Sequence, residues 1–451
     1  MIQRSTIAAT ALCLAAIVVT APAAATTEKQ GTATERQGTA TERQGTATER
    51  QGTATERQGT AVLSWKNGPA TEQDTTSAGY RITHGPYLQA LTYDGVTVAF
   101  TTSERGFSRV EVRRSDDPSA VRTCVTVSDG LVEAWNTMNA IRIDSLDAAT
   151  GYEYRIVSTR IDKFDPYDVR YGESVTTPWY AFRTPDPAAR SFTFVAMNDI
   201  HDTPQKCRRL LETQPLDEAQ MVFYVGDMMN YFEREDQPYE SFIDVSTDLF
   251  ARHKPFAVVR GNHETRGRLA RTYGRYIHNT PEGHYYGFYT FGDTAVVMLD
   301  CGEDKPDSHE VYAGLAAFDA YRLEQAAWLR EVLRSREFRR ARHRIVLLHI
   351  PPVDERMAPQ DETLVGEMLQ WHGNVHWGEI LLPLLAGTRI DLMITAHQHS
   401  FHLLEPLRGV HDFPIIINDN RSALTVRCDG EGIRVRATDM DGTVKLDTLF
   451  E

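Results

Sequence analysis

Residues 390–401 read IDLMITAHQHSF, and this stretch places two histidines directly after a short apolar run. Apolar runs of four to eight residues are typical of buried strands, so the pattern predicts a strand that ends just before His397 and His399. Two histidines in such a place are often only solvated polar residues. Their interpretation therefore depends on whether other strands of the chain end in the same way.

Four further apolar runs in the C-terminal part of the chain are followed by carboxylate, amide or imidazole side chains. The runs are 192–197 (FTFVAM), 221–225 (MVFYV), 255–260 (PFAVVR) and 344–348 (RIVLL), and the side chains that follow are Asp199, His201, Asp227, Asn262 and His349. Helical patterns such as 321–333 lie between the runs, and this alternation predicts an α/β domain with a largely parallel sheet covered on both faces. Because sites in such sheets form at the carboxyl ends of strands, we expect these side chains to gather at one edge.

Two aspartates, one asparagine and four histidines are more ligands than one metal ion can use. They match two ions that share a carboxylate, and imidazole with carboxylate suits zinc, iron or manganese. If Asp199 and His201 lie on extended backbone, side chains two apart point the same way and can serve one ion. His397 and His399, on a turning loop, can serve one ion each.

The N-terminal half of the chain shows a different pattern. Short runs at 96–100, 110–112, 141–143 and 152–156 alternate apolar and polar residues, which predicts antiparallel strands of a β-sandwich. In the stretch 146–156, LDAATGYEYRI, we expect the hydroxyl of Tyr152 to turn back onto the backbone. The Pro- and Ala-rich segment 183–189 is predicted to link this domain to the next.

Residues 1–25 have the features of a signal peptide: a positive Arg4, an apolar stretch over 6–20 and the small residues APAAA at 21–25. This predicts an exported protein (secreted, periplasmic or at the cell surface) with no integral membrane span after removal of the signal. An uncleaved signal anchor is the alternative.

Residues 30–57 are four copies of QGTATER. A coiled coil needs two apolar positions in every seven, and each copy offers one alanine and one glycine. We therefore predict a disordered tether over 26–79.

The 451-residue chain has a formal net charge of -14, which argues against nucleic acid or an anionic membrane as the main partner. A polyanionic substrate would then need positive charge supplied locally. Outside the signal peptide, the widely spaced Cys124, Cys207, Cys301 and Cys428 leave disulfide pairing open.

The polar segments together resemble the signature of the calcineurin-like metallophosphoesterases, which runs Asp-x-His, Gly-Asp, Gly-Asn-His-Asp/Glu, His and Gly-His-x-His. This resemblance implies a metallophosphoesterase-type α/β sandwich over 190–451. The stretches 285–300 (YYGFYTFGDTAVVMLD) and 324–329 (EQAAWL) resemble those of purple acid phosphatases. The region 80–186, with HGPYLQ at 84–89 and FRTP at 182–185, resembles the fibronectin type III-like N-terminal sandwich of that group.

The resemblance implies a dinuclear metal centre bridged by Asp227. One ion would be held by Asp199, His201, Asp227 and His399, and the other by Asp227, Asn262, His349 and His397. It further implies an acid-phosphatase-like hydrolase that cleaves small phosphate monoesters by attack of a metal-activated water, with His263 as the general acid.

Further roles are expected around these ligands. Asn230 would orient His263 by accepting its second N–H, and Asn262, His263 and His402 would face the substrate. Glu264 is expected to be a structural hydrogen-bonding residue, and 371–379 (WHGNVHWGE) to form a pocket wall or a lid.

Two departures from the family pattern lead to expectations of their own. Purple acid phosphatases place a tyrosine ligand three residues after the bridging aspartate, where this chain has Asn230, with Tyr231 one residue late. We therefore expect a colourless protein. Ala396 replaces the usual glycine of the last motif, and a slight backbone shift is expected there.

Two alternative functions stay open on sequence grounds. The same site could serve a phosphodiesterase or a nucleotide-cleaving hydrolase. The chain could also be a non-catalytic surface binding module whose sandwich makes the contacts. Substrate, metal identity and oligomeric state are not specified by the sequence.

Overall fold

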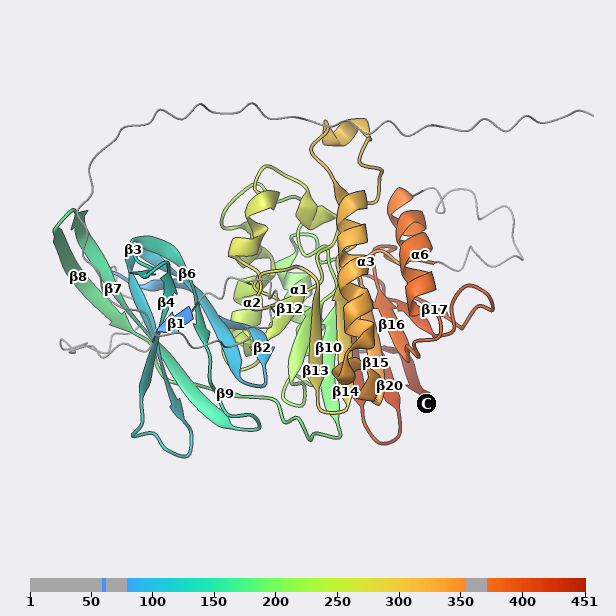
Figure 1. Ribbon diagram of the computed structural model, residues 1–451, viewed down its shortest axis with the longest axis horizontal. Helices are drawn as coiled ribbons and strands as arrows, with labels where there is room; N and C mark the ends of the chain where they lie inside the picture. The colour runs from blue at the N-terminus through green and yellow to red at the C-terminus, as the bar shows by residue number, and fades with distance from the viewer. Residues whose placement is uncertain (1–58, 62–78, 354–370) are drawn as a thin grey trace, which may run out of the picture. The chain divides into compact units, whose positions relative to one another are not determined.

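The computed structural model describes residues 59–61, 79–353 and 371–451 (Figure 1). The predicted signal peptide and most of the predicted tether lie outside these residues. Within the tether prediction, Gly59–Ala61 forms a short strand, β1, which pairs antiparallel with β4. Ladder pairing uses backbone groups alone, so a segment without an apolar pattern can still take part in it.

The N-terminal region is an antiparallel β-structure, as the alternating runs predict. Its strands are β2 (Ile82–Thr92), β3 (Gly95–Arg114), β4 (Arg122–Ser128), β5 (Leu131–Val132), β6 (Asn136–Ile143), β7 (Gly151–Asp165), β8 (Asp168–Thr176) and β9 (Tyr180–Arg183). The long β3 pairs with β2 and β6 through its first half and with β4 and β7 through its second. The Tyr152 hydroxyl accepts a hydrogen bond from the backbone N–H of Asp147 at 2.8 Å, which confirms the expected turn of this side chain.

The C-terminal region contains two mixed six-stranded sheets. The first has the order β12 (Phe256–Val258), β11 (Met221–Tyr224), β10 (Phe192–Met197), β19 (Ser422–Cys428), β20 (Ile433–Asp439) and β21 (Val444–Phe450). The second has the order β13 (Gly287–Phe291), β14 (Thr294–Leu299), β15 (His343–Leu348), β16 (Leu392–Thr395), β18 (Ile415–Ile417) and β17 (His402–Leu404). The predicted parallel arrangement is found in β10–β12 and in β14, β15, β16 and β18, and antiparallel strands extend both sheets.

Alternate residues of the strands bury their side chains on opposite faces. In β10, Phe194 belongs to the core between the two sheets, whereas Val195 packs on the outer face with Leu210 of α1. In β15, Leu347 belongs to the shared core and Leu348 to an outer core with Trp377. A strand buried on both faces must be apolar throughout, which explains the continuous runs in the sequence.

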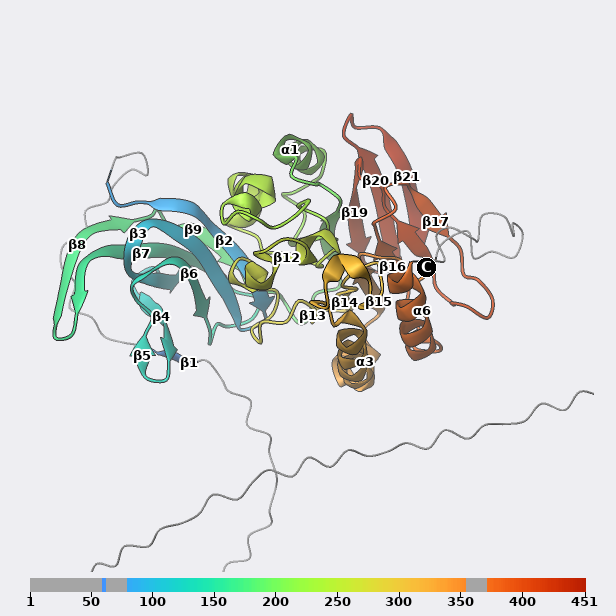
Figure 2. The same cartoon turned by 90° about the horizontal axis from the view of Figure 1, so that it is seen from above.

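Helices cover the outer faces of the two sheets. They are α1 (Pro204–Glu212), the continuous helical segment η1 (Tyr239–Ile243), α2 (Asp244–Ser246) and η2 (Thr247–Ala251), then α3 (Phe318–Arg334), α4 (Arg336–Arg340) and α6 (His372–Leu385). Short 3-10 turns are η3 (His263–Thr265), η4 (Ala270–Arg275) and η5 (Glu310–Tyr312). Figure 2 shows α3 and α6 on one side of the domain and α1 near β19–β21 on the other.

Two further sequence questions are settled for the described part of the chain. None of its helices combines the length and apolar character needed to cross a membrane. Cys124, Cys207, Cys301 and Cys428 are all buried and unpaired with one another.

Candidate metal centre

The predicted ligands lie on loops that follow strands of both sheets. β10 leads to Asp199 and His201, β11 to Asp227, and β12 to Asn262. In the second sheet, β15 leads to His349, and β16 leads to His397 and His399. The chain therefore brings five separate loops to one place.

Five of these residues have left-handed backbone. The φ angles are 51° at Asp199, 50° at His201, 56° at Asp227, 71° at His397 and 55° at His399. The expectation that Asp199 and His201 lie on extended backbone is wrong, because β10 ends at Met197 and both residues turn sharply. Such backbone costs of order 1–3 kcal/mol per non-glycine residue, and it persists only where the surroundings enforce it.

One group of ligand atoms comes from Asp199, His201 and His399. The two Nε2 atoms of the histidines lie 3.1 Å apart. Asp199 Oδ1 is 3.1 Å from Nε2 of His399 and 3.5 Å from Nε2 of His201. A tetrahedral zinc ion with bonds of ~2.0–2.1 Å spaces its ligand atoms by about 3.3 Å, so these separations fit one ion.

A second group comes from Asp227, His349 and His397, whose ligand atoms all lie within 4.8 Å of one another. His349 Nδ1 donates to the carbonyl of Val225 at 2.6 Å, which leaves Nε2 as the atom that faces Asp227 Oδ2 at 3.0 Å. A histidine whose second nitrogen is fixed by a backbone carbonyl is the usual arrangement of a metal ligand. Position 226 requires glycine for a steric reason, because a Cβ at this residue would lie 2.4 Å from His349 Nδ1.

Several buried ligand atoms lack a hydrogen-bond partner. They are Asn262 Oδ1, His349 Nε2 and His397 Nε2. Nε2 of His349 is close to Asp227 but outside hydrogen-bond geometry. Leaving such groups unsatisfied costs roughly 1–3 kcal/mol each, and a bound cation would satisfy them together. The donor set therefore fits two metal ions of the zinc, iron or manganese type.

The field within the site favours positive charge. Burial alone would lower the pKa of His349, but Asp227 and then Asp199 raise it to about 10. Burial would raise the pKa of Asp199, yet His201 and His399 hold it well below its usual range. Burial, with His349 second, lowers the pKa of His397 to about 4, so this imidazole is neutral and able to coordinate.

The buried carboxylate of Glu264 ties the loop after β11 to the loop after β12. It accepts backbone hydrogen bonds from Asp227 (2.9 Å), Met228 (2.6 Å), Met229 (3.2 Å) and Gly261 (2.8 Å). Burial, with Asp227 second, raises the pKa of Glu264 to about 7. We assign the ionised form, because all four groups that face it are donors. The expectation of a structural role for Glu264 agrees with this geometry.

His263 lies beside Asp227, and its ring is fixed from one side. Its Nδ1 donates to the backbone carbonyl of Asn230 at 2.8 Å, and its Nε2 is 3.9 Å from Asp227 Oδ2. The Asn230 side chain, by contrast, donates to the carbonyl of His201 at 3.2 Å. The predicted contact between Asn230 and His263 thus exists through the main chain, which any residue at this position could supply.

Three other positions singled out in the sequence have the following surroundings. Ala396 does not adopt left-handed backbone, which begins at His397, so the alanine imposes no strain there. His402 begins β17, and its Nε2 lies 2.8 Å from the Ser400 hydroxyl in a local contact. Tyr231 is exposed, with its ring 6.0 Å from that of His263.

Three residues around the site were given no role from the sequence, and a fourth, Trp371, lies in the segment 371–379 that was expected to form a pocket wall or a lid. Asn198 donates to Asp199 Oδ2 at 2.6 Å, and Lys206 donates to the Asp199 carbonyl at 2.5 Å. Arg266 Nη1 is 3.3 Å from His263 Nε2, and the Trp371 ring is 4.6 Å from the His397 ring. Asn198, Arg266 and Trp371 could have been suspected from the sequence, because each lies inside one of the polar motifs or within a few residues of one. Lys206 gives no such signal.

The region that holds these ligands resembles a known protein family. Residues 192–401 match the family model described as calcineurin-like phosphoesterase. No protein of curated function matches the chain.

Two solved structures share the fold. Purple acid phosphatase PPD1 from yellow lupin (Lupinus luteus) seeds has a TM-score of 0.56 at 14% identity, over 80% of this chain and 73% of that one. The structure of PhoD has a TM-score of 0.53 at 12% identity, over 81% of this chain and 92% of that one.

Replacing Glu264 by glutamine should weaken both the fold and the metal centre. The amide can accept at one oxygen only, and its NH₂ group opposes backbone donors, so we expect a loss of ~2–4 kcal/mol in the free energy of unfolding. Urea unfolding and elemental analysis of the purified protein measure the two effects. Glu282→Gln, at an exposed position, is the control. Wild-type stability with full metal content in Glu264→Gln would contradict the assigned role.

Proposed function

Residues 192–401 form a domain of the calcineurin-like phosphoesterase family, and on this premise we propose that the protein hydrolyses phosphate monoesters at a two-metal centre. The observation that carries the proposal is the convergence of ligand side chains from five loops, among which three buried atoms lack a hydrogen-bond partner. A binding module without catalysis would have no need to keep three such atoms unsatisfied in its interior.

The proposed ligands divide into two sets that share Asp227. Asp199, His201 and His399 hold one ion with it, and Asn262, His349 and His397 hold the other. When bound, the two ions supply Lewis-acid activation of water and of the phosphoryl group, and positive charge against the phosphate oxygens. This supplies locally the positive charge that a chain of net charge -14 lacks.

The chain's own groups hold these ligands in place. Asp227 Oδ1 accepts from the backbone N–H of His263 at 3.0 Å, which orients the shared carboxylate. Val225 fixes the ring of His349, and Asn198 fixes the carboxylate of Asp199. A rigid arrangement matters because phosphoryl transfer depends mainly on positioning and electrostatic stabilisation.

His263 is the proposed general acid. The carbonyl of Asn230 anchors Nδ1, so Nε2 is the atom turned toward the Asp227 side of the centre. From there Nε2–H can deliver a proton to the oxygen of the departing alcohol. Arg266, paired with Glu303 at 2.8 Å, lies 3.3 Å from the same nitrogen. Because a guanidinium only donates, this contact is made while Nε2 is unprotonated and is broken when Nε2 takes up the proton that it delivers.

The finer features of the proposal rest on resemblance. The β-structure before the catalytic domain supports an acid-phosphatase-like enzyme, because purple acid phosphatase PPD1 aligns over both parts of the chain. We propose that the protein is exported, because residues 1–25 have the features of a signal peptide. The substrate is proposed to be a small phosphorylated molecule.

Turnover of p-nitrophenyl phosphate and of bis(p-nitrophenyl) phosphate by the metal-loaded protein tests the reaction class. We expect faster turnover of the monoester, and its loss in Asp227→Asn, which replaces the shared carboxylate by an amide with one neutral oxygen. Faster turnover of the diester would favour the phosphodiesterase alternative. No turnover of either ester by protein with two ions bound would favour the non-catalytic alternative.

His263→Ala tests proton delivery. Loss of a general acid should reduce kcat by ~10²–10⁴-fold on an alkyl phosphate, whose leaving group needs a proton. The reduction should be much smaller on p-nitrophenyl phosphate, whose leaving group departs readily as an anion. His284→Ala, at an exposed histidine, is the control. Equal reductions on both substrates would show that His263 does not act as the acid.

A further inference from the structure

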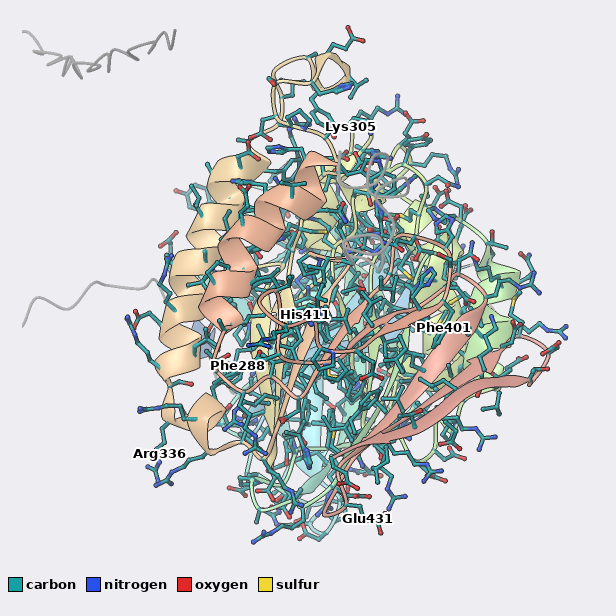
Figure 3. The ribbon with its side chains drawn as sticks, turned by 90° about the vertical axis from the view of Figure 1, so that its right-hand side faces the viewer. Phe288, Lys305, Arg336, Phe401, His411 and Glu431 are labelled. Atoms are coloured by element: carbon teal, nitrogen blue, oxygen red, sulfur yellow. The ribbon has the colours of Figure 1, made fainter. Side chains whose placement is uncertain are left out.

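A second group of metal-capable side chains lies where α3 and α6 begin. Figure 1 shows the two helices side by side, and Figure 3 places their first turns at the end of the domain that carries Lys305, opposite Arg336. Asp319 is in the first turn of α3, and His372 and His376 are in the first two turns of α6. None of these residues belongs to the proposed dinuclear centre.

The two histidines are four residues apart on one helix, so they share a face. Their rings lie 5.1 Å apart with an interplanar angle of 22°. Asp319 Oδ1 is 2.7 Å from His372 Nε2 and 3.1 Å from His376 Nδ1. All three ligand atoms lie within 4.8 Å of one another.

We propose that Asp319, His372 and His376 bind a third metal ion, a divalent transition-metal ion such as Zn²⁺. Two imidazoles and one carboxylate are ligand types that such ions prefer, and their ligand atoms are close enough together to bind one ion. The side chains of Asp319, His372 and His376 are 39%, 31% and 20% exposed, so an ion can enter from solvent and keep water in its remaining positions.

Arg322 supports the carboxylate of this site. Its guanidinium is fully buried, donates to the carbonyls of Cys301 (2.9 Å) and Glu303 (2.5 Å), and donates to Asp319 Oδ1 at 2.9 Å. Hydrogen bonding of a ligating carboxylate by a neighbouring group is a common feature of metal sites. The ring of His372 is held by Asp319 at Nε2 and by stacking on the ring of His376.

The charges around the site are mixed. Arg322 and the N-terminal first turns of both helices are positive and act against the binding of a cation. Asp307 offsets the first turn of α3, because it accepts from the backbone N–H groups of Phe318 (2.8 Å) and Asp319 (3.0 Å). Arg322 Nη1 and His372 Nε2 both lie within hydrogen-bond distance of Oδ1 of Asp319, at 2.9 Å and 2.7 Å. Arg322 Nη1 is also 3.4 Å from His376 Nδ1. Because a guanidinium only donates, this contact makes His376 Nδ1 an acceptor, the form in which an imidazole nitrogen can bind a metal ion.

The position of the site suggests a structural role toward the dinuclear centre. Trp371 immediately precedes His372, and its ring meets that of His397 at 4.6 Å and 73°. Gly373, which follows His372, donates its backbone N–H to the carbonyl of Asp304 at 3.0 Å. An ion that joins α6 to α3 therefore holds the segment that places Trp371 against His397.

Metal stoichiometry of the full-length protein tests the proposal. The protein is stripped with chelator, dialysed against excess Zn²⁺, passed through a size-exclusion column and analysed for zinc. We expect three equivalents in the wild type and in the control His284→Ala. We expect one equivalent fewer in His372→Ala, in His376→Ala and in the double variant. The same zinc content in wild type and in all these variants would overturn the proposal.

Two readouts separate this site from the dinuclear centre. Asp227→Asn should lose the ions of that centre and keep the one that His372→Ala removes, so either site can fail alone. Replacement of Zn²⁺ by Co²⁺ gives the protein a visible absorption spectrum, and the double variant should lose one component of it. The double variant should elute from the size-exclusion column at the same volume as the wild type, which shows that it is folded. A folded double variant with an unchanged Co²⁺ spectrum would contradict a third ion.

Discussion

Buried lone pairs need a positive partner, and this requirement governs the arrangement of the catalytic domain. Nitrogen and oxygen atoms from five loops point into one small space, and protein donors reach only some of them. Among them, Asn262, His349 and His397 each keep a buried atom without a hydrogen bond. Two metal ions would satisfy the whole set at once, whereas the hydrogen bonds within the site leave Asn262 Oδ1, His349 Nε2 and His397 Nε2 without a partner.

The scaffold that enforces this convergence is built from two sheets and one carboxylate. Parallel strands bring their carboxyl ends to the same edge, and the left-handed turns at Asp199, Asp227 and His397 aim side chains back over that edge. Glu264 binds the loops after β11 and β12 together through four backbone N–H groups. This buried network offsets part of the energetic cost of the left-handed backbone, and the ligand Asp227 contributes its backbone N–H to it.

Much of the site could be predicted from sequence, because the ligands follow apolar runs that are easy to recognise. The turn of Tyr152 onto its own backbone was predictable for a similar reason, since it depends on residues nearby in the chain. The division into two sheets was not predictable from the alternation of elements, because the pairing of β10 with β19 joins segments more than two hundred residues apart.

Contacts that depend on backbone atoms or on distant packing also escaped the sequence. The group that anchors His263 is the carbonyl of Asn230, which residue identity does not reveal. Asp319 meets His372 only because α3 and α6 lie side by side over the second sheet. The histidines of 371–379 were visible as a pattern, but their carboxylate partner lies 53 positions earlier in the chain.

Anomalous diffraction from crystals of the metal-loaded protein tests the central claim most directly. The account predicts two anomalous peaks about 3.5–4 Å apart, one on each side of the Asp227 carboxylate. One peak would lie among Asp199, His201 and His399, and the other among Asn262, His349 and His397. Fully loaded crystals that show no peak within this group of side chains, or only one, would contradict it.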